Sequence, residues 1–152
     1  RNANDEDHSD MAAFYNNIGL VYKGQKKYTE ALDFHKKSLA IHKQHLPPNH
    51  PDIADSHNNI GLVYYDLNKY DLAMEYYQQS LQIKLKSLPG DHPGIARSYA
   101  NIAWIHEEKR EWKEALELFE KALNIFQHSF SSQHPNVLKV KARIEHVSAN
   151  LK

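Results

Sequence analysis

The sequence predicts an all-α protein, a right-handed α-solenoid built from antiparallel helix pairs. Two observations predict this class: residues return in register every 42 positions, and the apolar residues within each period recur at helical spacing. Asn17, for example, returns as Asn59 and again as Asn101. In such an array each unit covers its neighbour's apolar face, and no unit has a closed core of its own. This architecture favours recognition surfaces over catalytic pockets.

The register divides the chain into a short lead, three full helix pairs and a single last helix. We expect one continuous domain, made of a flexible lead over 1–7, repeats over 8–49, 50–91 and 92–133, and a capping helix within 134–152. The predicted helices are 9–23, 29–46, 51–66, 71–88, 93–108, 113–130 and 136–151. The chain opens at Arg1 on a polar stretch, and we interpret it as a piece of a longer protein.

The second repeat shows why each element is expected. Pro51 fixes φ in the first helical turn and pushes His50 toward an extended conformation, which suits an N-cap. Asn68-Lys69 is expected to make the turn between the two helices, and Asp71 to cap the second helix. The same order of proline, turn and second helix is expected in the other two repeats.

Small and aromatic residues recur where helices must pack. A small residue stands where two helix backbones approach closely, since a larger side chain would force them apart. These positions are Gly19, Gly61 and Ala103 in the first helix of each pair, and Ala31, Ala73 and Ala115 in the second. The aromatic residues Tyr28, Tyr70 and Trp112 begin each second helix, and core packing explains them better than base stacking.

The last helix has one apolar face and one polar face, as the end of a solenoid requires. Its stripe of Val140, Ile144 and Val147 is expected to cover apolar residues of the third repeat. The residues to be covered are Leu116, Phe119 and Leu123. A natural cap and the point where the chain was cut are both open readings of this helix.

Composition limits the partners. Nineteen Lys and Arg balance nineteen Asp and Glu, so the formal net charge is zero. The chain therefore has no overall electrostatic attraction for nucleic acid or a membrane surface. The chain has no cysteine, no signal peptide and no apolar run long enough to span a bilayer, and a cytoplasmic location fits. No cofactor is expected.

The recurring small residues, the aromatic after the turn and the proline in the loop resemble the tetratricopeptide repeat. The 42-residue period and the Asn-Asn-Ile-Gly and His-Pro-Asp-Ile-Ala segments resemble the long repeats of kinesin light chains and nephrocystin-type proteins. The resemblance implies helix pairs, A and B, with the A helices lining a concave face that binds a protein or peptide. It implies no single function, because such repeats serve many partners.

Three asparagines form the first candidate binding set. Asn17, Asn59 and Asn101 occupy one position of successive A helices, so they are expected to form a ladder on the concave face. An amide both donates and accepts, which suits the backbone of an extended peptide. The alternative is that these amides tie adjacent A helices together. Asn16 and Asn58 lie beside the ladder and suit either role.

A second candidate set lies toward the C-terminal end. Some tetratricopeptide domains hold a terminal carboxylate with Lys and Asn on one A helix, Asn on the next, and Lys and Arg on the third. Asn101, Lys139 and Arg143 match the last three places, whereas Asn58 and Leu62 depart from the first two. Arg97 adds a further cation, so an acidic ligand is favoured about equally with a basic polar cap.

Metal binding and catalysis find little support. His8, His50, His92 and His134 lie one repeat apart, too far to share a metal ion, and helix-start chemistry explains them. His42 and His45 are three residues apart but have no third ligand close in sequence. The acidic run Glu107, Glu108, Glu111 and Glu114 is expected to be a solvated surface at a turn. We therefore predict neither an enzyme nor a metal site.

The sequence favours a scaffold-type binding module whose concave groove takes a short peptide or an extended segment. The alternatives are a structural spacer or oligomerisation array, with weak self-association, and a regulatory arm of a larger multidomain protein.

Overall fold

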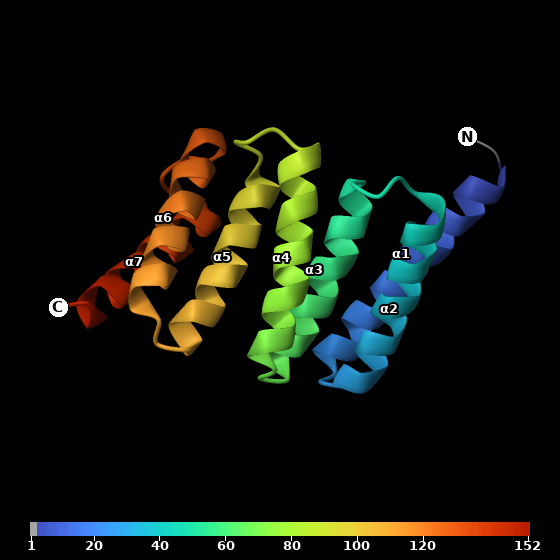
Figure 1. Ribbon diagram of the computed structural model, residues 1–152, viewed down its shortest axis with the longest axis horizontal. Helices are drawn as coiled ribbons and strands as arrows, with labels where there is room; N and C mark the ends of the chain where they lie inside the picture. Colours follow the sequence, from blue (N-terminus) through green and yellow to red (C-terminus); the bar gives the residue numbers. More distant parts are fainter. Residues whose placement is uncertain (1–2) are drawn as a thin grey trace. The chain divides into compact units, whose positions relative to one another are not determined.

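The computed structural model describes residues 3–152, with side chains from residue 7 onward. Seven α-helices and no β-strand occur within 3–152, which confirms the all-α prediction (Figure 1). They are α1 Ala3–Gly24, α2 Tyr28–His45, α3 Pro51–Asp66, α4 Tyr70–Ser87, α5 Pro93–Glu108, α6 Trp112–Ser129 and α7 Pro135–Asn150. The last six lie within one residue of their predicted bounds.

Helix α1 differs from its prediction because it begins at Ala3 and not at residue 9. Residues 3–7 of the predicted flexible lead are therefore helical, while Arg1 and Asn2 lie outside the described residues. The sequence before Asp10 is acidic, and negative charge near a helix N-terminus is stabilised by the helix dipole. As a result His8 lies inside α1, and the helix-start role predicted for it is wrong.

The helix-start role is confirmed for the other three repeating histidines. His50, His92 and His134 are the N-caps of α3, α5 and α7, and a proline follows each one. The ring Nδ1 of each accepts a hydrogen bond from the backbone N–H two residues on, at 3.0, 2.9 and 3.1 Å. The bond requires a lone pair on Nδ1, so this ring nitrogen is the acceptor in all three caps.

The turns between paired helices repeat as well. Lys26, Asn68 and Arg110 adopt the left-handed conformation, with φ of 62°, 60° and 59°. This confirms the turn expected at Asn68, a residue type that tolerates left-handed backbone. Asp71 does not cap the next helix as predicted, because α4 already begins at Tyr70 and places Asp71 in its first turn.

The helices form two compact units, Arg1–Ser87 and Leu88–Lys152. In the first unit α1 packs on α2, α2 on α3, and α3 on α4. In the second unit α6 packs on both α5 and α7. The single continuous domain expected from the register stays a prediction.

Close approach at the predicted small residues is confirmed in the first unit. A Cβ added to Gly19 would lie 2.7 Å from the ring of His35, and one added to Gly61 would lie 2.7 Å from the ring of Tyr77. Both rings are buried, and they lie one 42-residue period apart in the sequence. An aromatic ring of the paired B helix, α2 or α4, thus occupies the space where a side chain of each glycine would lie.

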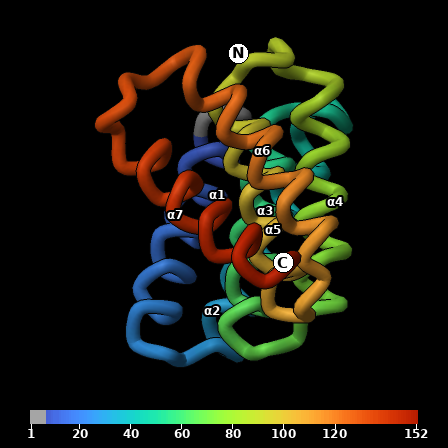
Figure 2. Tube along the Cα trace, turned by 90° about the vertical axis from the view of Figure 1, so that its left-hand side faces the viewer, coloured from blue at the N-terminus to red at the C-terminus, as the bar shows by residue number. Residues whose placement is uncertain are grey.

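The second unit has a continuous apolar core over α5, α6 and α7. Val140, Val147 and Phe119 belong to one buried cluster, and Leu116, Leu123 and Ile144 pack against it. Figure 2 shows α7 beside α6, as their contacts require. The expected cover of the third repeat by the last helix is therefore confirmed.

Candidate functional site

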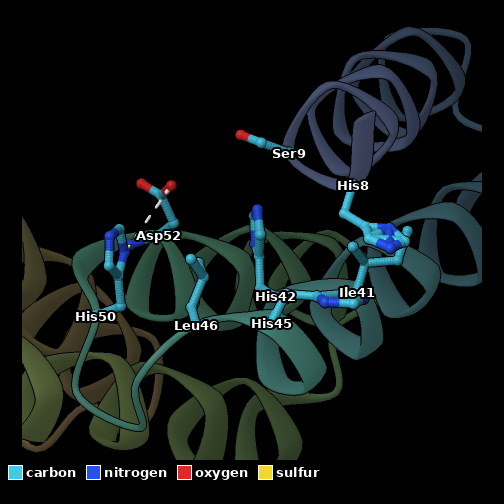
Figure 3. Close-up of a pocket in the computed structure, with 8 residues that line it drawn as sticks. All are labelled: His8, Ser9, Ile41, His42, His45, Leu46, His50 and Asp52. Carbon is cyan, nitrogen blue, oxygen red and sulfur yellow. Dashed lines mark hydrogen bonds and ion pairs between the residues drawn. The ribbon is translucent and has the colours of Figure 1, made fainter. Parts of the chain in front are cut away.

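A hollow opens in the first unit where α1, the end of α2 and the start of α3 meet (Figure 3). Its volume is about 340 Å³, and its lining is His8, Ser9, Ile41, His42, His45, Leu46, His50 and Asp52. A second hollow of about 180 Å³ shares Ser9, His42 and Asp52 with it, and adds Ala13, Asn16 and Asp55. The two form one polar depression on the side of the A helices α1 and α3.

His42 stands at the centre of this depression. Its side chain is buried, and its Nδ1 lies 2.9 Å from Oγ of Ser56. Burial lowers the pKa of His42 below its ordinary value of 6.5. The carboxylates of Asp52 and Asp55 raise this pKa, whereas His50 lowers it further. The ring is therefore neutral at pH 7. Figure 3 shows it standing between Asp52 and His8, with its edge toward the open space.

The walls of the depression are polar but carry few charges. The rings of His8 and His45 stack at 3.7 Å between centroids and close one side. On the other side Asp52 Oδ2 lies 3.9 Å from Nδ1 of His50. A neutral imidazole, a hydroxyl and an amide beside carboxylates can donate to and accept from a peptide backbone.

The structure separates the two predicted asparagines of α1. Asn16 lines the depression, and its Oδ1 lies 3.0 Å from Nδ1 of His35. Asn17 is exposed and lines a different hollow, together with Phe14 and Val21. Asn58 and Asn59 are half-buried on α3. The binding role of all four stays a prediction.

In the second unit, two of the predicted cationic side chains lie over the same aromatic ring. The Nζ of Lys139 lies 5.5 Å, and the guanidinium carbon of Arg143 4.7 Å, from the ring centroid of Trp104. Attraction between a cation and the face of an indole ring stabilises this arrangement. The stack is a side-chain contact between α7, which carries both cations, and α5, which carries Trp104.

Arg143 also forms an ion pair that the sequence did not reveal. Its Nε donates to Oε1 of Glu107 at 3.0 Å, and its Nη2 donates to the same oxygen. Glu107 is 7% exposed, so the expected solvated surface is wrong for this residue. Glu107 lies in the last turn of α5 and not in the following turn, which lets it face Arg143 on α7.

The remaining predicted residues of the second unit lie on α5. Arg97 is exposed and Asn101 is half-buried. Because Arg143 already gives two donors to Glu107, an acidic ligand would have to share this guanidinium. The acidic-ligand role of Arg97, Asn101, Lys139 and Arg143 stays a prediction.

Two further findings concern residues 3–152. No group of three or more His, Cys, Asp or Glu side chains in this range is arranged to hold a metal ion. No helix in it combines the length and the apolar character needed to cross a membrane.

The sequence pattern of the tetratricopeptide repeat matches residues 10–86 and 85–128, which is most of the chain. The chain belongs to the tetratricopeptide repeat family. Repeats of this family are general modules of protein–protein interaction. No curated protein sequence matches this tetratricopeptide chain.

Several solved structures share the fold. A Podosopora anserina protein described as a kinesin light chain with nearly identical TPR-like repeats is 22% identical, with a TM-score of 0.84; the match covers 95% of this chain and 68% of that one. BtubC (BKLC) from P. vanneervenii is 18% identical, with a TM-score of 0.84 over 92% of this chain and 56% of its own. The first TPR of Spaghetti (RPAP3), bound to an HSP90 peptide, is 17% identical, with a TM-score of 0.68 and 94% coverage of both chains.

Membership in the family explains part of what sequence reasoning missed. His35 takes the repeat position of Tyr77 and Phe119, so the register alone marks it as a core residue. The pair of Glu107 and Arg143 has no such signal, because neither residue type recurs at its position. Their contact depends on how α5 and α7 lie in space.

Proposed function

We propose that this tetratricopeptide chain is a protein–protein interaction module that holds a short peptide, or an extended segment of a partner, against its A helices. Membership in the family supports this proposal. The observation that carries it is the depression around His42, which offers neutral donors and acceptors on the side of α1 and α3. An extended backbone needs such partners for its N–H and C=O groups.

The contacts of the first unit fit a bound backbone. His42 uses Nδ1 for Ser56, and its ring edge faces the depression, where it can meet a peptide N–H or C=O. Ser9 adds a hydroxyl and Asn16 an amide. We propose that Asn59 holds the same segment farther along α3. These side chains project from helices, whose backbone is already ordered. Binding therefore costs the protein little conformational entropy.

We further propose that the second unit takes an acidic group of the ligand. Lys139 is exposed above Trp104, and Arg97 is exposed on α5. Asn101 supplies an amide, and Arg143 adds positive charge despite its pairing with Glu107. The Spaghetti (RPAP3) structure contains the HSP90 peptide SRMEEVD, which has three acidic side chains. That precedent supports an acidic peptide as the first ligand to try.

The test is capture of peptides from a library followed by titration calorimetry. Changing both Asn59 and Asn101 to Ala should weaken binding of captured peptides by about 0.5–1.5 kcal/mol for each hydrogen bond lost. Lys139→Glu should abolish binding of acidic peptides and spare neutral ones. Lys141→Glu is the matched control, since Lys141 is exposed on the same helix and outside the predicted set.

Equal affinities in wild type and all variants would place the ligand on another surface and reject this proposal. Arg143 is left unchanged in these assays, because its loss would also strand the buried carboxylate of Glu107.

Oligomerisation is the second candidate function. The observation that favours it is an exposed apolar face on α1, where Phe14 and Val21 are 60% and 59% exposed.

A further inference from the structure

The depression around His42 carries negative charge. The described residues that line it include the carboxylates of Asp52 and Asp55, but neither lysine nor arginine. The two aspartates are three residues apart on α3, so they lie on one side of the helix. The Asp52 side chain is 50% exposed, and Asp55 is exposed as well. A hollow whose walls carry charge of one sign attracts a ligand group of the opposite sign.

The contact between Asp52 and His50 does not neutralise the carboxylate. Oδ2 of Asp52 lies 3.9 Å from Nδ1 of His50, but this nitrogen accepts a hydrogen bond from the backbone N–H of Asp52 at 3.0 Å. A ring nitrogen that uses its lone pair in this way has no proton to donate to the carboxylate. Among the side chains of residues 7–152, no lysine or arginine pairs with Asp52. The charge of Asp52 is therefore available to a ligand at the edge of the depression.

His42 presents a hydrogen-bond acceptor to the same space. Its side chain is 8% exposed, and its Nδ1 lies 2.9 Å from Oγ of Ser56. When Nδ1 donates to this oxygen, Nε2 holds a lone pair, and it has no hydrogen-bond partner within residues 7–152. Figure 3 shows the ring edge facing the open space between Asp52 and His8. A side chain that is buried this deeply, with a polar atom left facing a hollow, indicates a ligand that completes its hydrogen bonding.

Helix packing does not require the polar pair of His42 and Ser56. Two periods later the same positions are Phe126 and Val140, which are 2% and 4% exposed and belong to one apolar cluster. An apolar pair therefore suffices to pack a B helix on the following A helix. The polar pair of the first unit points to a role in binding.

The start of an A helix does not require the two carboxylates either. Helix α5 begins with the same cap, in which the backbone N–H of Gly94 donates to Nδ1 of His92 at 2.9 Å, although Gly94 has no side chain. Gly94 takes the repeat position of Asp52, and Arg97, of opposite charge, takes the position of Asp55. The repeat thus folds without acids at these positions, and their chemistry is particular to the depression.

We infer that the depression holds a cationic side chain of the bound peptide, with lysine as the best fit. This inference rests on the proposed function and adds the class of side chain that the site selects. An ammonium group has three donors and no acceptor, and carboxylate oxygens of Asp52 and Asp55 together with Nε2 of His42 supply three acceptors. Ile41 and Leu46 line the adjoining part of the depression, where the methylene chain of a lysine can lie.

The first experiment is capture of peptides from a random library by the 152-residue chain. The peptides are acetylated at the N-terminus, so that a side chain is the only source of an ammonium group. We expect the captured peptides to be enriched in lysine or arginine at one position. The double variant Asp52→Asn, Asp55→Asn should lose this enrichment. Glu75→Gln is the matched control and should keep it, because Glu75 is exposed on α4 and does not line the depression.

The second experiment is titration calorimetry with one captured peptide and its twin, in which norleucine replaces the lysine. Norleucine keeps the aliphatic chain and removes the charge. In wild type the twin should bind roughly tenfold more weakly, the loss expected for charge-assisted hydrogen bonds. In the double Asn variant the two peptides should bind about equally. The variant His42→Phe, Ser56→Val copies the apolar pair of Phe126 and Val140, so it should fold and should lower the preference for lysine.

The outcomes separate this inference from the proposed function. Captured peptides without enrichment in lysine or arginine overturn the inference and leave the proposed function standing. The same holds if the double Asn variant keeps the full preference for lysine over norleucine. A wild-type chain that captures no peptide rejects the proposed function, and the inference with it. Circular dichroism and thermal unfolding of each variant confirm that the helices remain folded.

Discussion

At the residue scale, Gly61 shows how little space the paired helices leave. A Cβ there would lie 2.7 Å from the Tyr77 ring, which is buried and cannot move freely. Gly61→Ala should therefore lower the free energy of unfolding by about 1–3 kcal/mol, measured by urea denaturation. Gly24 is the control, because nothing lies within 4 Å of its added Cβ. Gly24→Ala should be neutral or stabilise by about 0.4–1 kcal/mol, and equal losses at both sites would contradict this packing.

Two buried histidines should make the chain sensitive to acid. Burial, with a smaller effect of Lys23, lowers the pKa of His35 from 6.5 to about 4, and burial with Lys43 does the same for His57. Between these pH values the unfolded chain binds more protons than the folded one. The stability contributed by neutral burial is thus complete above pH 6.5 and is lost progressively as the pH falls toward 4. Each histidine accounts for roughly 3 kcal/mol of this loss, at about 1.4 kcal/mol per pKa unit.

The measurement is urea denaturation at intervals from pH 7.5 to pH 4. His35→Phe places at this position the residue found at Phe119, one of its repeat equivalents, and should reduce the loss at acid pH. His128 is exposed on α6, so His128→Gln is the matched variant that removes a histidine without disturbing the core. An identical profile in His35→Phe and wild type would show that His35 does not contribute.

At the element scale, one ion pair joins α5 to α7. Arg143→Gln would leave Glu107 buried without its charged partner. We expect a loss of about 3 kcal/mol of unfolding free energy, the lower end for buried pairs, since 28% of the Arg143 side chain is exposed. Lys141→Gln, an exposed change on the same helix, should cost less than about 0.5 kcal/mol. Thermal and urea unfolding of both variants decide whether the pair or the general charge of α7 matters.

Helix α7 should also be needed to keep the second unit from aggregating. Phe119 is fully buried, and Val140 and Val147 share its cluster. Deleting residues 136–152 would expose this core, and exposed apolar patches promote aggregation. Light scattering should detect aggregates in the shortened chain and none after removal of residues 151–152 alone. A monomeric shortened chain with an unchanged melting temperature would show that α7 is dispensable.

The elements themselves were largely predictable from the sequence, because proline, turn residues and apolar spacing act locally. Pro51 fixes the start of α3, and Asn68 fixes the turn after it. The start of α1 was not predictable, since no proline or cap marks it and an acidic sequence extends the helix. Glu107 was misjudged for a different reason: its burial comes from a contact with α7, thirty-six residues away.

At the scale of the whole molecule, the candidate site was less predictable than the fold. The 42-residue register identifies which residues share a position, but not which side chains of different helices meet. His42, Asp52 and Ser9 come from three segments and form one depression only after α1, α2 and α3 pack. Conversely, Asn16 and Asn17 are neighbours in sequence and lie on different hollows.

The whole-molecule charge gives a test of how ligands are selected. The chain has no net charge, so long-range attraction should not bring an acidic peptide to it; local cations such as Lys139 and Arg97 must do so. Exposed charges are screened over about 8 Å at physiological ionic strength, and over shorter distances in more salt. Raising the salt concentration should therefore weaken acidic peptides at the second unit and leave neutral peptides at the His42 depression unaffected. Calorimetric titrations at low and high salt measure both classes, and an equal salt response would mean that one surface binds them both.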